Sequence, residues 1–541
     1  MNRKYILIIF LLMTILLVSC ENDIVVSLND NITFPPEPFS QDDHPLIKDQ
    51  YAFYDISGSQ VKYWGAANVH DPVMIKEGDY YYVFSTDAQF GVTSQKGIHI
   101  RKTKDLINYE FVGTALDLDS ILPAIDYVEY NRDGDKVNFF WAPEIYKHQK
   151  EDGSFEYWLF YSNSSFGQRT SFMGLAKSDN IEGPYLHETE ILRTHQSVNS
   201  PNAIDPALLV EEVDGVKKMY LSYGSWSQGI YLIELNPNTG EPLIKQTLTE
   251  KEVLVNTENP GVTTLKTKLI PTPNDPAFGE RLLNIYTAEA PYIIKEGNYY
   301  YLFVTTGVDL TYDYNTRVFR SENITGPYVD SEGNHAISSS NRDNFRNYGN
   351  MITDAYQFKT NPSDGELVRG WSGIGHSAAY KDNNEWLFLS HYRGTHIDKD
   401  RFFFGVRRMH FIDGWPVVEA NRYVQGGNDD LSNANLSGNY QIHILNKHVA
   451  NSSLNDNVIS IIKKSENIIL TEEKIDENWF KVEGDYNGKW RFNDNLLELT
   501  INNIKYKGII TPQWDFERHE GTLSFSLINE LGISLWGVRF I

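Results

Sequence analysis

The chain has 541 residues and a formal net charge of −24, which is long enough for two to three domains and a large core. Such an acidic chain lacks the basic surface that phosphate binding needs, which argues against nucleic acid as a partner. Aromatic residues make up 13% of the chain, and such residues suit both β-strands and surfaces that bind sugar rings.

The N-terminus is predicted to be a lipoprotein signal. Basic Arg3 and Lys4 precede an apolar run over residues 5–18 that is too short for a comfortable transmembrane helix. The run ends in the letters LVSC, which resemble the bacterial lipobox whose cysteine is lipidated. Cys20 is the only cysteine, so an intramolecular disulfide is excluded. We expect a lipid anchor on Cys20 in the bacterial cell envelope, at the outer membrane; a plain signal peptide with an incidental cysteine is the alternative.

Composition divides the rest of the chain. Residues 1–19 are the predicted signal peptide, and residues 20–60, which are polar and contain prolines, are predicted to be a tether and entry segment. Residues 61–430 hold five internal repeats. Residues 431–541 alternate apolar and polar side chains over short stretches, which predicts a small antiparallel β-barrel or sandwich. Its tryptophans could bind sugar, but core packing is the favoured use.

Five segments of the repeat region open with nearly the same phrase. They read HDPVMIKEGDYYYVFS, APEIYKHQKEDGSFEYWLFYS, IDPALLVEEVDGVKKMYLSYGS, APYIIKEGNYYYLFVTT and GHSAAYKDNNEWLFLS. A second signature follows each of them, beginning at Gly97, Gly174, Gly229, Arg317 and Gly405. Units of roughly 60 to 90 residues with short strands and turns match four-stranded blades. The pattern predicts an all-β fold, a five-bladed β-propeller followed by the C-terminal β-domain.

Ionisable residues lie at the openings of the five phrases. Equivalent ends of the inner strands of a propeller meet around its central funnel, so Asp71, Asp205 and Glu289 are predicted to converge there. Acids held close together have their pKa values split, and glycoside hydrolysis needs such a pair of acid and base. Glu144 follows its proline instead of preceding it, so its side chain should point to the opposite face of the strand, and no catalytic role is assigned to it.

The ordered elements His-Asp-Pro, Trp-Ala-Pro-Glu, Asn-Ala-Ile-Asp-Pro, Glu-Ala-Pro-Tyr-Ile and Gly-His-Ser resemble glycoside hydrolase family 43. Glu-Ala-Pro-Tyr-Ile and YGSWSQGIY are most similar to its endo-α-1,5-L-arabinanase branch. The resemblance implies that Asp71 is the general base, Glu289 the general acid and Asp205 the carboxylate that orients the acid and raises its pKa. It also implies an inverting enzyme, in which base and acid lie about 6.5–9.5 Å apart.

The same resemblance implies further site residues. His376 of Gly-His-Ser matches a histidine that faces a calcium ion, with the other ligands mostly water; a hydrogen-bonded core histidine is the alternative. Asn202, Ser225 and Trp226 match loop positions that contact sugar hydroxyls. Two neighbours of the strand openings complete the predicted substrate-binding set. His70 is expected to shape the pocket, and Trp141 to offer a ring face to the sugar or to be buried between blades.

The expected substrate is arabinan or its oligosaccharides. Two alternatives stay open: an exo-acting α-L-arabinofuranosidase or β-xylosidase on the same scaffold, and a non-catalytic glycan-binding lipoprotein of the cell surface. The phrase SHYRGTHIDKDRFFFGVRR in the last unit departs from the usual arabinanase pattern. We expect Arg393 and His396 in it to alter a distal subsite. The sequence does not indicate an oligomeric state.

Overall fold

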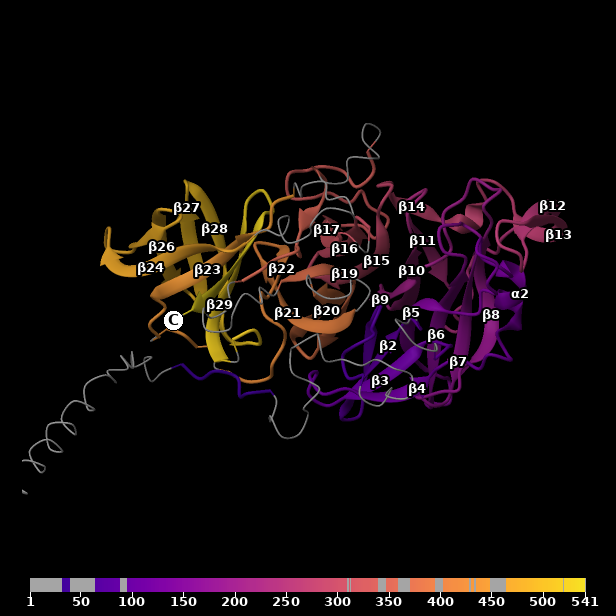
Figure 1. Ribbon diagram of the computed structural model, residues 1–541, viewed down its shortest axis with the longest axis horizontal. Helices are drawn as coiled ribbons and strands as arrows, with labels where there is room; N and C mark the ends of the chain where they lie inside the picture. The colour runs from indigo at the N-terminus through magenta and orange to yellow at the C-terminus, as the bar shows by residue number, and fades with distance from the viewer. Residues whose placement is uncertain are drawn as a thin grey trace, which may run out of the picture.

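A computed structural model places the chain as a propeller joined to a barrel (Figure 1). It describes residues 32–38, 64–87, 95–308, 311, 313–338, 347–358, 370–394, 402–427, 430–432, 434–447, 464–518 and 520–540. Cys20, the predicted signal peptide and His396 lie outside these residues. Within the described part of the chain, no helix is both long enough and apolar enough to cross a membrane.

The propeller has five antiparallel blades, which confirms the predicted fold. Blade 1 is β1 (Val73–Glu77), β2 (Tyr80–Ser85), β3 (His99–Thr103) and β4 (Glu110–Thr114). Blade 2 is β5 (Trp141–Gln149), β6 (Phe155–Ser164), β7 (Ser171–Ser178) and β8 (Leu186–Thr194). Blade 3 is β9 (Ala207–Val213), β10 (Val216–Tyr223), β11 (Ile230–Leu235) and β14 (Glu280–Leu283). Blade 4 is β15 (Glu289–Glu296), β16 (Tyr299–Thr306), β17 (Asn315–Ser321) and β18 (Asn350–Met351), and blade 5 is β19 (Trp371–Asp382), β20 (Glu385–Gly394), β21 (Phe403–Ile412) and β22 (Trp415–Val418).

The first strands of the blades form the inner ring. They contact one another in the order β1, β5, β9, β15, β19 and back to β1. The five repeated phrases open these inner strands, and the second signature lies at the third strand of each blade. The ring is closed by main-chain hydrogen bonds between the segment before β1 and the start of β21, from Asn68 N to Phe402 O (2.8 Å) and from Phe404 N to Ala66 O (2.8 Å).

Three further elements are attached to blades 2 and 3. A short helix, α2 (Leu122–Val128), packs on β6 and β7. A two-stranded ribbon, β12 (Leu248–Asn256) and β13 (Thr263–Pro271), is inserted between β11 and β14 together with the 3-10 turn η3 (Pro276–Phe278). Helix and ribbon lie at the end of the molecule farthest from the barrel (Figure 1).

Each inner strand begins with a non-glycine residue in the left-handed backbone region. These residues are Asp71 (φ 53°), Ala142 (φ 40°), Asp205 (φ 57°), Ala290 (φ 52°) and His376 (φ 43°). In blades 2, 4 and 5 the pairing register shifts at the same point, as in a β-bulge. Such backbone strain costs on the order of 1–3 kcal/mol per residue and persists only where surrounding structure holds it. Bulges also re-aim side chains, so the fold has one device at five equivalent places that turns residues toward the funnel.

Hydrogen bonds between blades hold these strand openings. The amide of Ala142 donates to Thr86 Oγ1 of blade 1 (2.8 Å), and the amide of His376 donates to Thr305 Oγ1 of blade 4 (2.8 Å). Ala290 N donates to an oxygen of Asp205 (3.1 Å). These three openings are therefore fixed by side chains of the preceding blade, so neighbouring blades must pack before the mouth takes its final shape.

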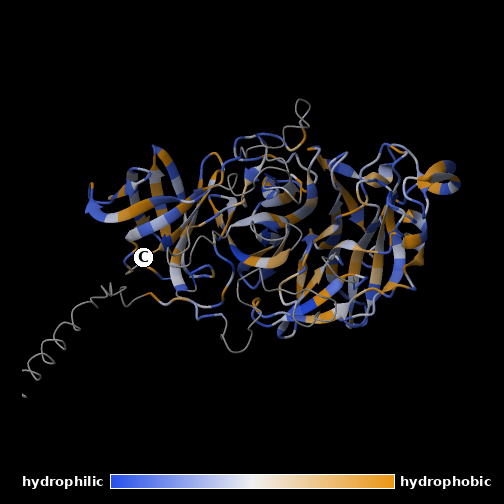
Figure 2. Ribbon diagram, in the orientation of Figure 1, coloured by the Kyte–Doolittle hydropathy of each residue, from blue (hydrophilic) through white to orange (hydrophobic). Residues whose placement is uncertain are grey.

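The C-terminal domain is a closed eight-stranded barrel. Its strands are β23 (Gly438–Ile444), β24 (Glu466–Lys474), β25 (Phe480–Gly484), β26 (Gly488–Asn493), β27 (Leu496–Ile501), β28 (Ile504–Asp515), β29 (Glu520–Asn529) and β30 (Ser534–Phe540). Apolar and polar residues alternate along the strands (Figure 2), because one face of each strand fills the interior. Trp490, Trp514 and Trp536 are buried, as the packing interpretation expects, and Trp479 is half-buried beneath Lys489.

Part of the predicted tether packs on this barrel. Pro35 is buried, and Ile32 and Phe34 lie against the apolar residues of the barrel interior. The ring of Phe34 fills the space beside Gly521 in β29. Residues 32–38 of the predicted tether and entry segment thus form a strap bound to the barrel, since a proline-rich stretch with little periodicity can also be an extended segment that docks on a domain.

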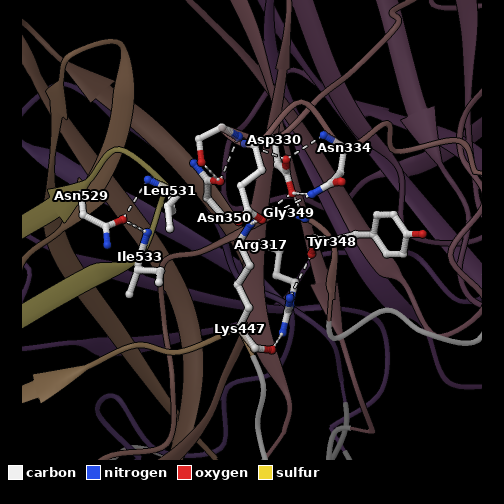
Figure 3. A network of polar contacts seen from close by, with 12 residues as sticks. Arg317, Asp330, Asn334, Tyr348, Gly349, Asn350, Lys447, Asn529, Leu531 and Ile533 are labelled. Carbon is white, nitrogen blue, oxygen red and sulfur yellow. Dashed lines mark hydrogen bonds and ion pairs between the residues drawn. The ribbon is translucent and has the colours of Figure 1, made fainter. Parts of the chain in front are cut away.

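The barrel and the propeller share a buried interface. Trp536 of β30 donates through Nε1 to the carbonyl of Val418 in β22 (2.7 Å). Lys447, just after β23, reaches into blade 4, where Nζ lies 3.2 Å from Asp330 Oδ2 and 2.6 Å from Glu332 Oε2 (Figure 3). Arg317 of β17 donates to the carbonyl of Lys447 (2.9 Å). The side chains of Lys447 and Asp330 are 7% and 0% exposed, so this ion pair is largely shielded from solvent.

We expect Lys447→Met to destabilise the two-domain protein by about 3 kcal/mol, because it leaves the buried charge of Asp330 without its cation. Glu332→Gln is the control, since that carboxylate is a third exposed and a solvent-screened pair contributes less than about 1 kcal/mol. Urea unfolding measured on both variants tests this. Equal losses would show that burial of the pair does not determine its contribution.

Candidate active site

All nine residues that the sequence analysis placed in the site line one cleft of about 740 Å³ at the mouth of the propeller. They are His70, Asp71, Trp141, Asn202, Asp205, Ser225, Trp226, Glu289 and His376. The cleft is open at the mouth end of the inner strands, where the left-handed residues turn side chains inward. Residues from all five blades therefore meet in one place.

Asp71 is held from three sides. His376 Nδ1 lies 2.8 Å from Oδ1 of Asp71, and the hydroxyl of Thr86 donates to Oδ2 (2.5 Å). The amide of Asp71 donates to Nδ1 of His391 (3.2 Å). Burial alone would raise the pKa of Asp71, but the charge and hydrogen bond of His376 hold that pKa well below its usual value. Asp71 is therefore ionised across the ordinary pH range, as a general base must be.

Thr86 and His391 belong to the site although sequence reasoning missed them. Thr86 accepts from Ala142 N and donates to Asp71, so one hydroxyl ties the openings of blades 1 and 2 together. Nδ1 of His391 lies 3.2 Å from the Asp71 amide and 3.5 Å from Oδ1 of the same residue, so this imidazole packs directly on the predicted base. Each is the last residue of a similar tripeptide in the second-strand region of its blade, Phe-Ser-Thr for Thr86 and Leu-Ser-His for His391. This shared position is the signal that could have found them.

Glu289 lies in blade 4 and is surrounded by hydrogen-bond donors. The hydroxyl of Tyr314 donates to Oε1 (2.6 Å). Trp226 Nε1 and Ser225 Oγ donate to Oε2 at 2.9 and 3.2 Å. Ser225 and Trp226 were predicted to contact sugar, but in the structure they bind the predicted acid. The acid is thus fixed in orientation before any substrate arrives.

Asp205 is buried close to Asp71 and to the backbone next to Glu289. One of its oxygens accepts from Ala290 N, next to Glu289. Burial, together with the negative charge of Asp71 and against the charge of His376, raises the pKa of Asp205 to about 6. The same two carboxylates outweigh burial at His376 and raise its pKa to about 9. Neighbouring acids of one funnel thus have different protonation behaviour, the property expected of a carboxylate-based hydrolytic site.

Two other residues of the sequence analysis lie away from the chemistry. Glu144 is buried where blades 2 and 3 meet, accepts from Ile145 N (2.8 Å) and Leu208 N (3.2 Å), and does not line the cleft. Burial raises its pKa to about 8. Arg393 is 2% exposed and packs beside Gly373, and it is not among the cleft residues. Arg393 therefore does not line the described cleft, and its effect on a distal subsite stays a prediction.

The wall of the cleft in blade 2 is aromatic. Trp141 stacks on Phe166, which is 74% exposed, with centroids 6.1 Å apart and an interplanar angle of 23°. Trp141 therefore belongs to the cleft and is not buried between blades. Asn202 accepts from Ser171 Oγ (2.7 Å), which fixes its amide at the cleft. Asp87, a buried acid that sequence reasoning missed, accepts from the amides of Gly97 and Phe140 and so anchors this wall.

The predicted calcium histidine has the chemistry of a metal ligand. His376 donates Nδ1–H to a carboxylate, and its raised pKa of about 9 keeps a proton on Nε2 as well. A cation bound at Nε2 would displace that second proton and give a carboxylate–histidine–metal arrangement. His70, Asp71 and His391 also bring one ligand atom each within 4.8 Å of one another. His391 is the poorer candidate because its Nδ1 already accepts an amide. Residues of this funnel therefore fit a cation bound by one imidazole and several oxygens.

The fold and the cleft define a class: a propeller glycosidase that works with carboxylates. Residues 65–416 match glycosyl hydrolases family 43, and residues 420–537 match the C-terminal lipocalin-like domain that accompanies it. The chain belongs to glycoside hydrolase family 43, and it is a glycoside hydrolase.

Two relatives show the range of the family. The chain is 28% identical to the extracellular endo-α-(1→5)-L-arabinanase of Thermotoga petrophila, over 87% of this chain and 94% of that protein. It is 29% identical to the extracellular exo-α-(1→5)-L-arabinofuranosidase of Cellvibrio japonicus, over 65% of this chain and 86% of that protein. The crystal structure of the Thermotoga petrophila endo-1,5-α-L-arabinanase matches with a TM-score of 0.67 and 26% identity, covering 88% of this chain and 99% of that one.

We expect Thr86→Val to lower kcat on the enzyme's polysaccharide about tenfold, because Asp71 loses a hydrogen bond to its charged form. Thr306→Val is the matched control. Thr306 is the last residue of β16, the second strand of blade 4, just as Thr86 follows the second strand of blade 1. It is fully buried, and its hydroxyl has no partner in the described residues. Initial rates and melting temperatures of both variants provide the measurement. A rate loss in Thr306→Val as large as that in Thr86→Val would contradict the role of Thr86.

Proposed function

We propose that this enzyme hydrolyses internal α-1,5-L-arabinofuranosidic bonds of arabinan with inversion at the anomeric carbon. The observation that carries the proposal is that Asp71, held ionised by His376, and Glu289, held by neutral donors, line one cleft. The two-domain relatives that span both parts of this chain are named endo-arabinanases, which supports arabinan as the substrate.

The reaction proceeds by a single displacement. Asp71 takes a proton from a water as its oxygen attacks the anomeric carbon, while Glu289 gives a proton to the departing glycosidic oxygen. The bond to the leaving sugar breaks and the new hydroxyl has the inverted configuration. Asp71 ends protonated and Glu289 ionised, and exchange with solvent restores both. Asp205, fixed to the amide next to Glu289, keeps negative charge near the acid and favours its protonated form.

Endo action is favoured over the exo alternative. The two relatives that align with 87% of this chain, from Thermotoga petrophila and Bacillus subtilis, are both named endo-arabinanases. Relatives that align with 61% and 65% of it include one endo-acting and one exo-acting enzyme. The stacked pair of Trp141 and Phe166 lines the same cleft as the acids and offers ring faces on which further sugars of a chain can pack.

We expect linear arabinan to yield a ladder of oligosaccharides from the first minutes, and Asp71→Asn and Glu289→Gln each to lower kcat at least a thousandfold. Product sizing by chromatography and anomeric NMR of the first product test the claim, with xylan and arabinoxylan as comparison polysaccharides. Arabinose as the sole early product would rule out endo action. Full binding of arabinan with no cleavage by the unmodified protein would instead support a glycan-binding role.

We also propose that His376 helps to bind a calcium ion through Nε2, with water and nearby carboxylate oxygens as the remaining ligands. Such an ion would supply positive charge that offsets the cluster of acids. Of the protein's own residues, Asp71 orients the imidazole through Nδ1, and Thr305 holds the His376 amide.

We expect the purified protein to contain about one calcium per chain and His376→Ala to lose it. Elemental analysis after gel filtration gives the ratio directly, without an activity assay. Thr306→Val serves again as the control that retains the metal. Calcium at full occupancy in His376→Ala would place the ion elsewhere.

For localisation we propose that Cys20 is lipidated and anchors the enzyme in the cell envelope, at the outer membrane. The lipobox-like letters before it support this, as do relatives named extracellular enzymes.

A further inference from the structure

Tyr314 lies between the two sides of the catalytic funnel. It immediately precedes β17 of blade 4, is 1% exposed and lines the cleft. Its neighbour Asn315 donates to the carbonyl of Asp313 (2.7 Å) and pairs with Ile374 of blade 5. The tyrosine is therefore fixed at the seam of blades 4 and 5, the two blades that supply Glu289 and His376.

The hydroxyl of Tyr314 contacts the predicted acid directly. It donates to Oε1 of Glu289 at 2.6 Å, whereas Trp226 and Ser225 donate to the other oxygen. An indole N–H can only donate, so Oε2 is committed to accepting. A tyrosine hydroxyl can accept as well as donate. The proton to be transferred therefore belongs on Oε1, where it points to the Tyr314 oxygen while Glu289 is protonated, and the Tyr314 hydroxyl donates to Oε1 once Glu289 is ionised.

The ring of Tyr314 contacts the residues around the base. It stacks on His391, with centroids 5.6 Å apart and an interplanar angle of 10°, and His391 accepts the amide of Asp71. A Cβ at Gly375 would lie 2.5 Å from the tyrosine ring, so the residue before His376 must be glycine to make room for it. Tyr314 thus packs on His391, which contacts the predicted base Asp71, and hydrogen-bonds the predicted acid Glu289.

We propose that Tyr314 is a positioning residue for the general acid, which orients Oε1 of Glu289 through its hydroxyl and fixes the acid relative to Asp71 through its stack on His391. The proposal rests on the proposed function and deepens it. A donor to Oε1 binds the carboxylate more strongly than the carboxylic acid. Tyr314 therefore stabilises the ionised Glu289 that forms as the proton moves to the leaving oxygen.

Tyr314→Phe removes the hydroxyl and keeps the stacked ring. We expect kcat on linear arabinan to fall about ten- to a hundredfold, with KM changed less than about twofold, because the lost hydrogen bond strengthens in the transition state. The alkaline limb of the pH profile of kcat/KM should move up by about one unit, since the acid holds its proton more tightly without the donor. His376 and Asp205, the other titratable groups near Glu289, are unchanged in this variant.

Tyr328→Phe is the matched control. Tyr328 is a buried tyrosine of the same blade, and its hydroxyl donates to the carbonyl of Ile324 (3.0 Å), away from the cleft. We expect this variant to keep the wild-type pH profile and kcat. Should Tyr314→Phe and Tyr328→Phe lose activity equally, or should the alkaline limb stay in place, Tyr314 has a structural role only.

A measurement without substrate separates this proposal from the proposed function. The carboxyl band of protonated Glu289 in infrared difference spectra, assigned by its loss in Glu289→Gln, is titrated in the wild type and in Tyr314→Phe. We expect the titration midpoint to rise by about one unit in the variant. If the midpoint rises but the wild-type protein does not cleave arabinan, the role of Tyr314 is supported and the proposed substrate is wrong. An unshifted midpoint would overturn the role of Tyr314 even in an active arabinanase.

Discussion

The site of this enzyme depends on a left-handed backbone conformation that residues other than glycine rarely adopt. At the start of every inner strand, the residue before the proline, or before Ser377 in blade 5, has a left-handed φ, and a neighbouring blade holds its amide in most of the five places. The strain is sustained because the hydrogen bonds that satisfy it exist only after the blades have closed into a ring. Three of these five positions, Asp71, Asp205 and His376, place an ionisable side chain in the funnel, and alanine occupies the other two.

The electrostatics follow from this convergence. Asp71, Asp205 and Glu289 would repel one another in a dry funnel, and the arrangement resolves this with one cation and several neutral donors. His376 pairs with Asp71 and holds it ionised, while burial keeps Asp205 partly protonated near neutral pH. Glu289 is surrounded by Tyr314, Trp226 and Ser225. The separation of base and acid roles therefore comes from unequal surroundings of equivalent strand ends.

The barrel stabilises the propeller at the side away from the aromatic wall. Lys447 from the barrel side closes an ion pair on blade 4, and Trp536 packs into the apolar cluster of blades 4 and 5. Tyr314 lies at the seam of the same two blades. The barrel thus supports the part of the ring that carries Glu289 and His376, which gives a physical reason for the second domain to accompany this catalytic domain.

Much of this protein was determined by local sequence. Five phrases, four with a proline, each with a turn and a β-rich run, indicated five hairpins. The acids at three of these openings were predicted to share one cleft, because equivalent strand ends meet in a propeller, and in the structure they do. Contacts between blades could not be predicted. His391 lies 320 residues from Asp71, and only ring closure places it there. Thr86 and Tyr314 contact Asp71 and Glu289 within one blade, 15 and 25 residues away, but the exact side-chain geometry that forms these contacts is also tertiary. The strap at residues 32–38 and the burial of Glu144 and Arg393 were likewise decided by tertiary packing, since a short polar or charged segment has the same local pattern whether water or another blade covers it.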